Sequence, residues 1–236
     1  MSTRTNEFGQ PIGPAVPGWT PRARPPRSPM EGRYCRVEPL DTGRHAEGLE
    51  SADRLDPEGR NWTYLGRETL HGVEAYRAWA AQAATSEDPL FYAFVDAVSG
   101  QAVGVGGYLR IDPANGAIEV GHLLFSPLMQ GTRIATEAMV LLMRRVFDEL
   151  GYRRYEWKCD ALNAPSRRAA ERLGFTFEGV FRQAVVVKGR NRDSAWFSIL
   201  DSEWPALKAA FERWLDPKNF DADGKQRKRL EEFRAA

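Results

Sequence analysis

The chain has 236 residues, which is long enough for one substantial α/β domain with additional segments at its ends. Its 33 Lys and Arg residues nearly balance 32 Asp and Glu residues. The resulting formal net charge of +1 predicts no general attraction to nucleic acid or to an anionic membrane. We therefore expect the partner to be a small molecule or a short peptide.

The N-terminal residues and the cysteines point to a cytoplasmic protein. Residues 1–10 are polar, and no later run reaches the roughly 20 apolar residues that span a membrane. Cys35 and Cys159 lie far apart, without the CxxC or Cys/His spacing of a metal site. We expect reduced, buried thiols, no bound metal and a cytoplasmic location.

Residues 1–30 form a Pro-rich arm without a helical or strand period, and we expect this arm to be extended and irregular. Phe8, Ile12, Val16 and Trp19 are apolar anchors that predict a strap across the domain. The alternative is a disordered leader.

Residues 31–205 read as one domain of alternating strands and helices, and residues 206–236 as a helical tail. Short turns at Ser99-Gly100 and Asp112–Gly116 predict an antiparallel meander, and a later strand–helix–strand crossover predicts a parallel pair. The fold class is therefore α/β (α+β), with a mixed, twisted central sheet flanked by helices. The expected strands are Tyr34–Pro39, Leu90–Ala97, Gln101–Ile111, Ala117–Phe125, Tyr155–Cys159, Thr176–Val187 and Ser194–Leu200. The expected helices are Thr42–Arg54, Thr69–Thr85, Thr132–Leu150, Ala164–Leu173, Pro205–Trp214 and the charged Gln226–Arg234.

The most informative segment is the strand-to-helix junction Leu123–Ala138. Free backbone N–H groups and the positive end of the dipole at a helix start form a site for a phosphate-type anion. Gly131 allows close approach of the backbone, Thr132 can cap the helix, and Arg133 adds a cation. An ordinary capped helix is the alternative.

The spacing Gln130-x-x-Arg133-x-Ala135 at this junction resembles the pyrophosphate loop of the GNAT superfamily of N-acetyltransferases. Arg133 stands where that loop usually has glycine, a variant similar to the RimJ/RimL-type branch. The segment Asn163–Phe175 resembles the Asn-x-x-Ser to Leu-Gly-Phe stretch of the same branch. There, helical spacing would place Asn163, Ser166 and Arg167 on one side of a short helix. The resemblance extends over residues 32–204.

The resemblance implies the GNAT fold and transfer of an acetyl group from acetyl-CoA to a primary amine of a small molecule or of a peptide or protein N-terminus. Backbone amides around Leu123–Phe125 would bind the pantetheine of the cofactor. The alternative function is a catalytically weak CoA-binding sensor or interaction module. The resemblance also suggests a homodimer. The residues implied for the cofactor are Leu123, Leu124, Phe125, Gln130, Gly131, Thr132, Arg133, Ile134, Ala135, Thr136, Asn163, Ser166 and Arg167.

For catalysis, Glu119 is the first candidate for the base, because a carboxylate among apolar neighbours has a raised pKa. A structural carboxylate paired with arginine is the alternative. His122 is the rival, and period-two alternation predicts that it lies on the opposite face of the strand. Residues 169–173 lack the tyrosine that many superfamily members use to protonate the thiolate, so the resemblance points to Ser166 as its substitute.

The acceptor pocket is expected between the loop and helix that follow the first strand and the final hairpin. Aromatic residues are more often core than pocket, and Asp193 is also a candidate to hold the hairpin turn. The residues expected to line the pocket are Trp62, Tyr64, Trp79, Tyr108 and Asp193.

Overall fold

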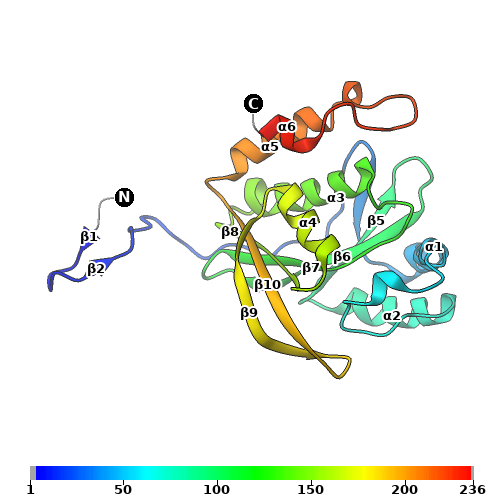
Figure 1. Ribbon diagram of the computed structural model, residues 1–236, viewed down its shortest axis with the longest axis horizontal. Coiled ribbons are helices and arrows are strands. Elements are labelled where there is room, and N and C mark those ends of the chain that lie inside the picture. Colours follow the sequence, from blue (N-terminus) through cyan, green and yellow to red (C-terminus); the bar gives the residue numbers. More distant parts are fainter. Residues whose placement is uncertain (1–3, 235–236) are drawn as a thin grey trace.

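The computed structural model describes residues 4–234, and its centre is a twisted eight-stranded sheet (Figure 1). The strand order is β3-β4-β5-β6-β7-β8-β10-β9. The strands are β3 (Met30–Glu31), β4 (Cys35–Pro39), β5 (Leu90–Asp96), β6 (Ala102–Asp112), β7 (Ala117–Phe125), β8 (Arg154–Asp160), β9 (Thr176–Val187) and β10 (Arg190–Leu200).

One pair in this sheet is parallel, and it positions the site described below. Strands β7 and β8 pair only from Ala117↔Arg154 to Val120↔Trp157, whereas the other neighbouring strands pair antiparallel. Beyond Val120 the two strands separate, so the second half of β7 has no ladder partner on that side. The predicted mixed sheet, with a parallel crossover between residues 117 and 159, is confirmed.

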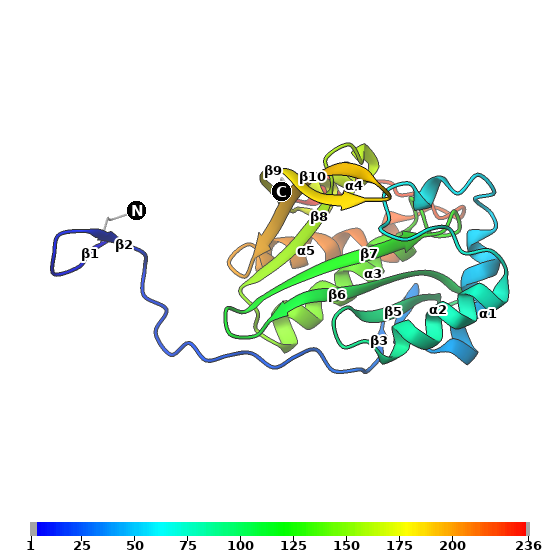
Figure 2. The same ribbon diagram turned by 90° about the horizontal axis from the view of Figure 1, so that it is seen from below.

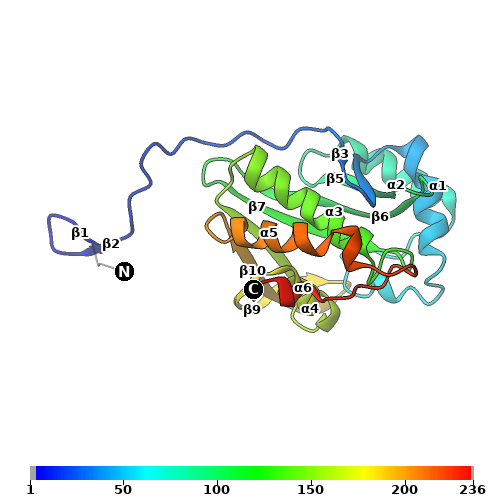
Figure 3. The same cartoon turned by 90° about the horizontal axis from the view of Figure 1, so that it is seen from above.

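Helices cover both faces of the sheet. The two helices α1 and α2 pack on one face, and α3 and α5 lie side by side on the other (Figures 1 and 3). The short helix α6 packs against α5 and touches α4. The helices are α1 (Thr42–Asp53), α2 (Val73–Thr85), α3 (Arg133–Arg144), α4 (Ala164–Leu173), α5 (Trp204–Trp214) and α6 (Leu230–Arg234), with short helical turns at Arg60–Trp62, Arg145–Glu149 and Pro217–Asn219.

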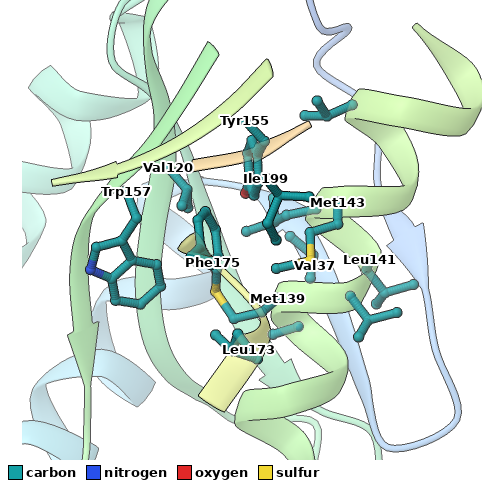
Figure 4. Packing of buried hydrophobic residues seen from close by; sticks show 14 of the residues in the cluster. Val37, Val120, Met139, Leu141, Met143, Tyr155, Trp157, Leu173, Phe175 and Ile199 are labelled. Atoms are coloured by element: carbon teal, nitrogen blue, oxygen red, sulfur yellow. The ribbon is translucent and has the colours of Figure 1, made fainter. Parts of the chain in front are cut away.

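The helix pattern read from the sequence follows from burial against the sheet. Met139 and Met143 of α3 point toward sheet side chains that include Tyr155 and Ile199 (Figure 4). Burying these side chains stabilises the fold by roughly 25 cal/mol per Å² of apolar surface removed from water. A second core under α1 and α2 contains Trp62 and other buried apolar residues.

Three predicted boundaries shift for local backbone reasons. Helix α2 begins at Val73 rather than Thr69, because Gly72 has φ 78° and is not helical. Strand β10 begins at Arg190 rather than Ser194, because Lys188 (φ 49°) and Gly189 (φ 70°) close a tight hairpin turn. The helix predicted to continue to Leu150 ends in a π-helical turn, Arg145–Glu149.

The arm departs from the predicted strap in its first half. Strands β1 (Arg4–Thr5) and β2 (Pro11–Ile12) form a small ribbon that projects away from the domain (Figures 2 and 3). Phe8 is 77% exposed and Ile12 51%, so neither anchors the arm to the domain, and Val16 is also exposed. From Trp19 onward the arm contacts the domain, and there the Trp19 indole Nε1 donates to the Ala114 carbonyl at 2.8 Å.

Two further expectations can be compared with the described part of the chain. Cys35 and Cys159 are both buried and free, as predicted. Within residues 4–234, the structure has no helix with the length and hydropathy needed for a membrane span.

Candidate active site

A cleft of about 1120 Å³ opens where β7 and β8 separate. Its walls are the second half of β7, the loop and first turn of α3, one side of α4, the turn at Arg60–Asn61 and the C-terminal segment. The predicted cofactor residues whose positions lie along this cleft are Leu123, Phe125, Gln130, Gly131, Thr132, Arg133, Ile134, Ala135, Thr136, Asn163 and Ser166.

The start of α3 is open toward the cleft. Thr132 occupies the N-cap position, but its hydroxyl donates to the Met129 carbonyl at 2.7 Å and makes no cap hydrogen bond. Gly131 has φ 71°, a conformation that favours glycine, and it turns the chain into the helix. The first N–H groups of the helix therefore lack a side-chain acceptor, which fits an anion such as a pyrophosphate.

Two polar side chains of this loop have defined partners. Gln130 Nε2 donates to Asn61 Oδ1 at 2.8 Å and to the Phe125 carbonyl at 2.7 Å, which ties the loop to the segment after α1. The Arg133 guanidinium lies over the Tyr34 ring, 4.2 Å from its centroid. The cation that replaces the usual glycine is thus held at the cleft wall by an aromatic ring.

Helix α4 supplies the second wall. Asn163 Oδ1 accepts from the Ser166 N–H at 3.1 Å and caps the helix, and Ser166 Oγ accepts from Trp157 Nε1 at 3.0 Å. Arg167 is not among the residues that line the cleft, and its guanidinium lies over the Phe177 ring. Arg168 and Arg172, four residues apart on the helix, line the cleft instead.

On β7 the side chains alternate around the cleft. Leu123 and Phe125 face it, whereas Leu124 is 3% exposed and packs into the core under α1 and α2. Leu124 is therefore available to a ligand only through its backbone.

Glu119 is buried within a balanced set of charges on the sheet face away from α3. Its Oε2 lies 2.7 Å from Arg110 Nη1 and 2.9 Å from Lys158 Nζ, and Lys158 also pairs with Glu156. Burial raises the pKa of Glu119, and Lys158 and Arg110 act in the opposite direction. The predicted rise is confirmed in direction, and the carboxylate also has the arginine partner of the structural alternative.

His122 lies on the same face as Glu119, so the predicted alternation is wrong. The register of β7 against β6 shifts between Gly121 and Leu124, and His122 has φ 52°, which marks a β-bulge. The His122 ring packs on Phe91, 5.4 Å between centroids, in the layer under α2. Partial desolvation and the charges of Arg67, Arg110 and Arg192 lower the pKa of His122, and the residue keeps part of its surface exposed to solvent.

Two residues predicted to line the acceptor pocket belong to the core instead. Tyr108 is fully buried, and its hydroxyl donates to the Leu142 carbonyl at 2.8 Å. Trp62 is 1% exposed and its indole donates to Asp53 Oδ2 at 2.8 Å. Both expectations are corrected, because large aromatic side chains gain most by full burial with their polar atom paired.

The other three expected acceptor residues differ in position. Tyr64 lines the cleft and donates to the Leu162 carbonyl at 3.2 Å. Trp79 is partly buried, with the Arg67 guanidinium 3.9 Å above its ring. Asp193 accepts from the Gln183 N–H at 2.7 Å and holds the β9–β10 hairpin, which is the alternative role stated for it.

Several cleft residues were not predicted from the sequence. Arg168 and Arg172 are visible as a helical i, i+4 pair, but the rotation of α4 about its axis is set by its packing. The remaining ones are Arg60, Asn61, Met139, Trp157, Pro165, Ala169, Leu173 and the C-terminal residues Trp214, Phe220, Asp223, Gly224, Lys225 and Gln226.

Comparison with known proteins gives the family. The model of the acetyltransferase (GNAT) domain matches residues 36–176. The Bacillus subtilis (strain 168) protein YdaF, named provisionally as a ribosomal N-acetyltransferase, is 30% identical over 181 residues, 73% of this chain and 92% of YdaF.

Solved structures agree with this match. A GCN5-related N-acetyltransferase from Brucella melitensis superposes with a TM-score of 0.91 at 51% identity, covering 94% of this chain and 100% of that one. The self-immunity acetyltransferase MccE for microcin C7, solved with acetyl-CoA and AMP, shares the fold with a TM-score of 0.63 at 21% identity, over 72% of this chain and 93% of MccE. The chain is a member of the GNAT family of N-acetyltransferases, and its cofactor is acetyl-CoA.

Proposed function

We propose that the protein acetylates a primary amine, and that the reaction takes place where β7 and β8 separate. The observation that carries this proposal is the opening of the parallel pair beyond Val120, directly beside the uncapped start of α3. Acetyl-CoA supplies the thioester whose acetyl group the amine takes. The chain would hold its phosphates at the first turn of α3 and its pantetheine along Leu123–Phe125.

We propose His122 as the group that accepts the ammonium proton. Its pKa is lowered, so the imidazole is neutral and able to accept a proton near pH 7. Glu119 is only 3% exposed and its Oε2 is already paired with Arg110 and Lys158, so its carboxylate is not open to an acceptor amine. We therefore propose that Glu119 is a positioning residue, which holds Arg110 and Lys158 in place on the sheet face that also carries His122.

Ser166 is proposed to assist the departing sulfur. Its Oγ accepts the Trp157 N–H, so the hydroxyl proton of Ser166 can be donated, and the Cys159 side chain is one acceptor within its reach. The position of Ser166 in the cleft wall next to Trp157 fits this role.

The acceptor is proposed to carry a negative group near its amine. Arg67, Arg110 and Arg192 lie close enough to His122 to lower its pKa, and together they favour a carboxylate or a phosphate. Amino acids, aminoacyl nucleotides and the N-terminus of a peptide with acidic neighbours meet this description. The name of YdaF points to ribosomal protein N-termini as one peptide class, and the AMP bound to MccE points to a nucleotide class.

Calorimetric titration with acetyl-CoA, followed in the same sample by thiol release with each amine class, tests the proposal. Binding followed by release with an acceptor that carries an anionic group is the expected result. Binding without release across the panel would favour a CoA-binding sensor. Release only with polycationic peptides would contradict the proposed acceptor class.

A homodimer and a cytoplasmic location remain predictions. The projecting arm exposes Phe8, Ile12 and Val16, and these side chains could pack against a second copy of the chain. Light scattering of the whole chain, and of a variant that lacks the residues before Trp19, would measure whether the arm determines the oligomeric state.

A further inference from the structure

The C-terminal segment Trp214–Gln226 lies outside the residues 36–176 that match the family model, yet it lines the cofactor cleft. Its contributions are the residues Trp214, Phe220, Asp223, Gly224, Lys225 and Gln226. The segment adjoins the loop that opens α3, since Phe220 lies beside Arg133. A part of the chain that follows the family domain therefore forms one side of the site.

This segment is a built structure held by side-chain hydrogen bonds. Asn219 is buried, and its Nδ2 donates to the carbonyls of Trp214 at 3.0 Å and Lys228 at 3.2 Å. The Lys228 N–H donates back to Asn219 Oδ1 at 2.9 Å, and Trp214 Nε1 donates to Gln226 Oε1 at 2.9 Å. The loop between residues 219 and 228 is thus closed on itself and on α5.

The two aromatic side chains of the segment contact the arginines of the cleft. Trp214 lies 5.0 Å from the Arg172 guanidinium, and Phe220 lies 5.5 Å from that of Arg133. Trp214 and Phe220 also pack edge to face on each other, 5.1 Å between centroids. Both rings are buried, so they hold these cations in place from behind.

The charges around the cleft fit a ligand with several phosphate groups. Its lining residues include the cations Arg60, Arg133, Arg168, Arg172 and Lys225, and Asp223 as an anion. Lys225 is exposed, and no salt bridge of its ammonium occurs among residues 4–234. It is therefore available to a phosphate.

We propose that Trp214–Gln226 is an integral wall of the cofactor site: Trp214 and Phe220 position Arg172 and Arg133, and Lys225 supplies a further cation to the phosphates of CoA. The inference rests on acetyl-CoA as cofactor and is independent of the identity of the acceptor. The segment makes the affinity for CoA depend on residues beyond the family domain.

Calorimetric titration of the whole chain with CoA measures the contribution of this wall to the Kd for CoA, and it needs no acceptor. Phe220→Leu removes one of the two rings beside Arg133, the other being Tyr34, and we expect the Kd for CoA to rise roughly fivefold. Because Phe220 is buried, the exposed Lys225→Gln is measured as well, and it should raise the Kd about threefold while leaving the melting temperature unchanged. Phe233→Leu is the matched control, since its ring carries Arg213 outside the cleft.

Titrations with CoA and with dephospho-CoA, which lacks the 3′-phosphate, show which phosphate group of CoA Lys225 contacts. If Lys225 faces the 3′-phosphate, Lys225→Gln weakens binding of CoA alone; if it faces the pyrophosphate, binding of both ligands weakens. If wild type binds CoA and the Kd is unchanged in both Phe220→Leu and Lys225→Gln, the proposal that Trp214–Gln226 forms a wall of the cofactor site is wrong. Acetyl transfer is measured separately, so a chain that binds CoA without turnover would contradict the proposed function and leave this inference standing.

A second readout distinguishes a positioning role from a general loss of stability. In an acetylation assay, Phe220→Leu should raise the KM for acetyl-CoA in parallel with the Kd and leave kcat and the KM of the acceptor near their wild-type values. A uniform fall in kcat, without a change in the KM for acetyl-CoA, would also contradict the proposal.

Discussion

His122 combines a strained backbone with a chemically suitable side chain. A non-glycine residue at φ 52° is uncommon, and here the conformation belongs to a bulge that turns the imidazole onto the Phe91 side of the sheet. Strain of this kind costs about 1 kcal/mol or more and persists where surrounding structure imposes it. The side chain that it presents is the proposed proton acceptor.

Replacing His122 separates the chemistry from the strain. His122→Gly keeps the positive φ at little cost, whereas His122→Ala retains the strain; both lack the imidazole. We expect kcat to fall about 100-fold or more in both variants, with the Kd for acetyl-CoA unchanged. Steady-state rates and calorimetry check this, with Glu119→Gln measured alongside. Near-wild-type kcat in His122→Gly would show that another group accepts the proton.

The pH dependence of kcat/KM follows from the sign of the shift on His122. Because the pKa of His122 lies below its ordinary value of about 6.5, the base is neutral at pH 7 and is lost as the pH falls through the lowered pKa. The acid limb of the profile should therefore lie below pH 6.5 and disappear in His122→Gly. A limb that persists in that variant would assign the titration to a different group.

At the scale of elements, α3 links the cofactor loop to the edge of the sheet. Glu137 on this helix is 6% exposed, and its carboxylate accepts the backbone N–H groups of Arg33, Tyr34 and Cys35. The turn from β3 to β4 is thus fastened to the helix that carries the phosphate loop. Gly32 fits this turn, because a Cβ there would lie 2.8 Å from the Cys35 carbonyl oxygen and would also clash with the Glu137 carboxylate.

Glu137→Ala leaves three backbone donors without their acceptor, so we expect a loss of about 3 kcal/mol in the free energy of unfolding. Urea denaturation checks the value. Glu212→Ala on the exposed side of α5 is the control and should change stability by less than about 0.5 kcal/mol. Equal effects of the two substitutions would argue against the fastening role of Glu137.

The open start of α3 makes a second prediction at this scale. Arg133→Glu places a negative charge at the first turn, where the helix dipole and free N–H groups favour an anion. We expect the Kd for CoA to rise at least tenfold, about 1.4 kcal/mol, as measured by calorimetry. An unchanged Kd would mean that the pyrophosphate is held elsewhere.

Much of the whole molecule could be predicted because its elements carry strong local signals. The helical repeat of α3 and the turn glycines, such as Gly131, identify the strand–helix junction and hence the proposed cofactor loop. The parallel pair follows from the crossover between residues 117 and 159. These features are determined by residues close together in the sequence.

The rest depends on packing that the sequence does not display. A histidine at positive φ has no periodic signature, so the bulge at His122 reverses the predicted face. The rotation of α4 about its axis places Arg168 rather than Arg167 in the cleft wall. Tyr108 is buried in the core, with its hydroxyl paired, and does not line the acceptor pocket. The loop that brings Lys225 to the cleft is placed by Asn219 through tertiary hydrogen bonds.

The most direct test of the proposed site is mass spectrometry of the amine panel after incubation with acetyl-CoA and either wild type or His122→Gly. We expect an acetylated acceptor with wild type and its loss with the variant, while calorimetry shows that both proteins bind acetyl-CoA. An acetylated acceptor formed equally by both proteins would contradict the role of His122. Failure of wild type to bind acetyl-CoA would contradict the site itself.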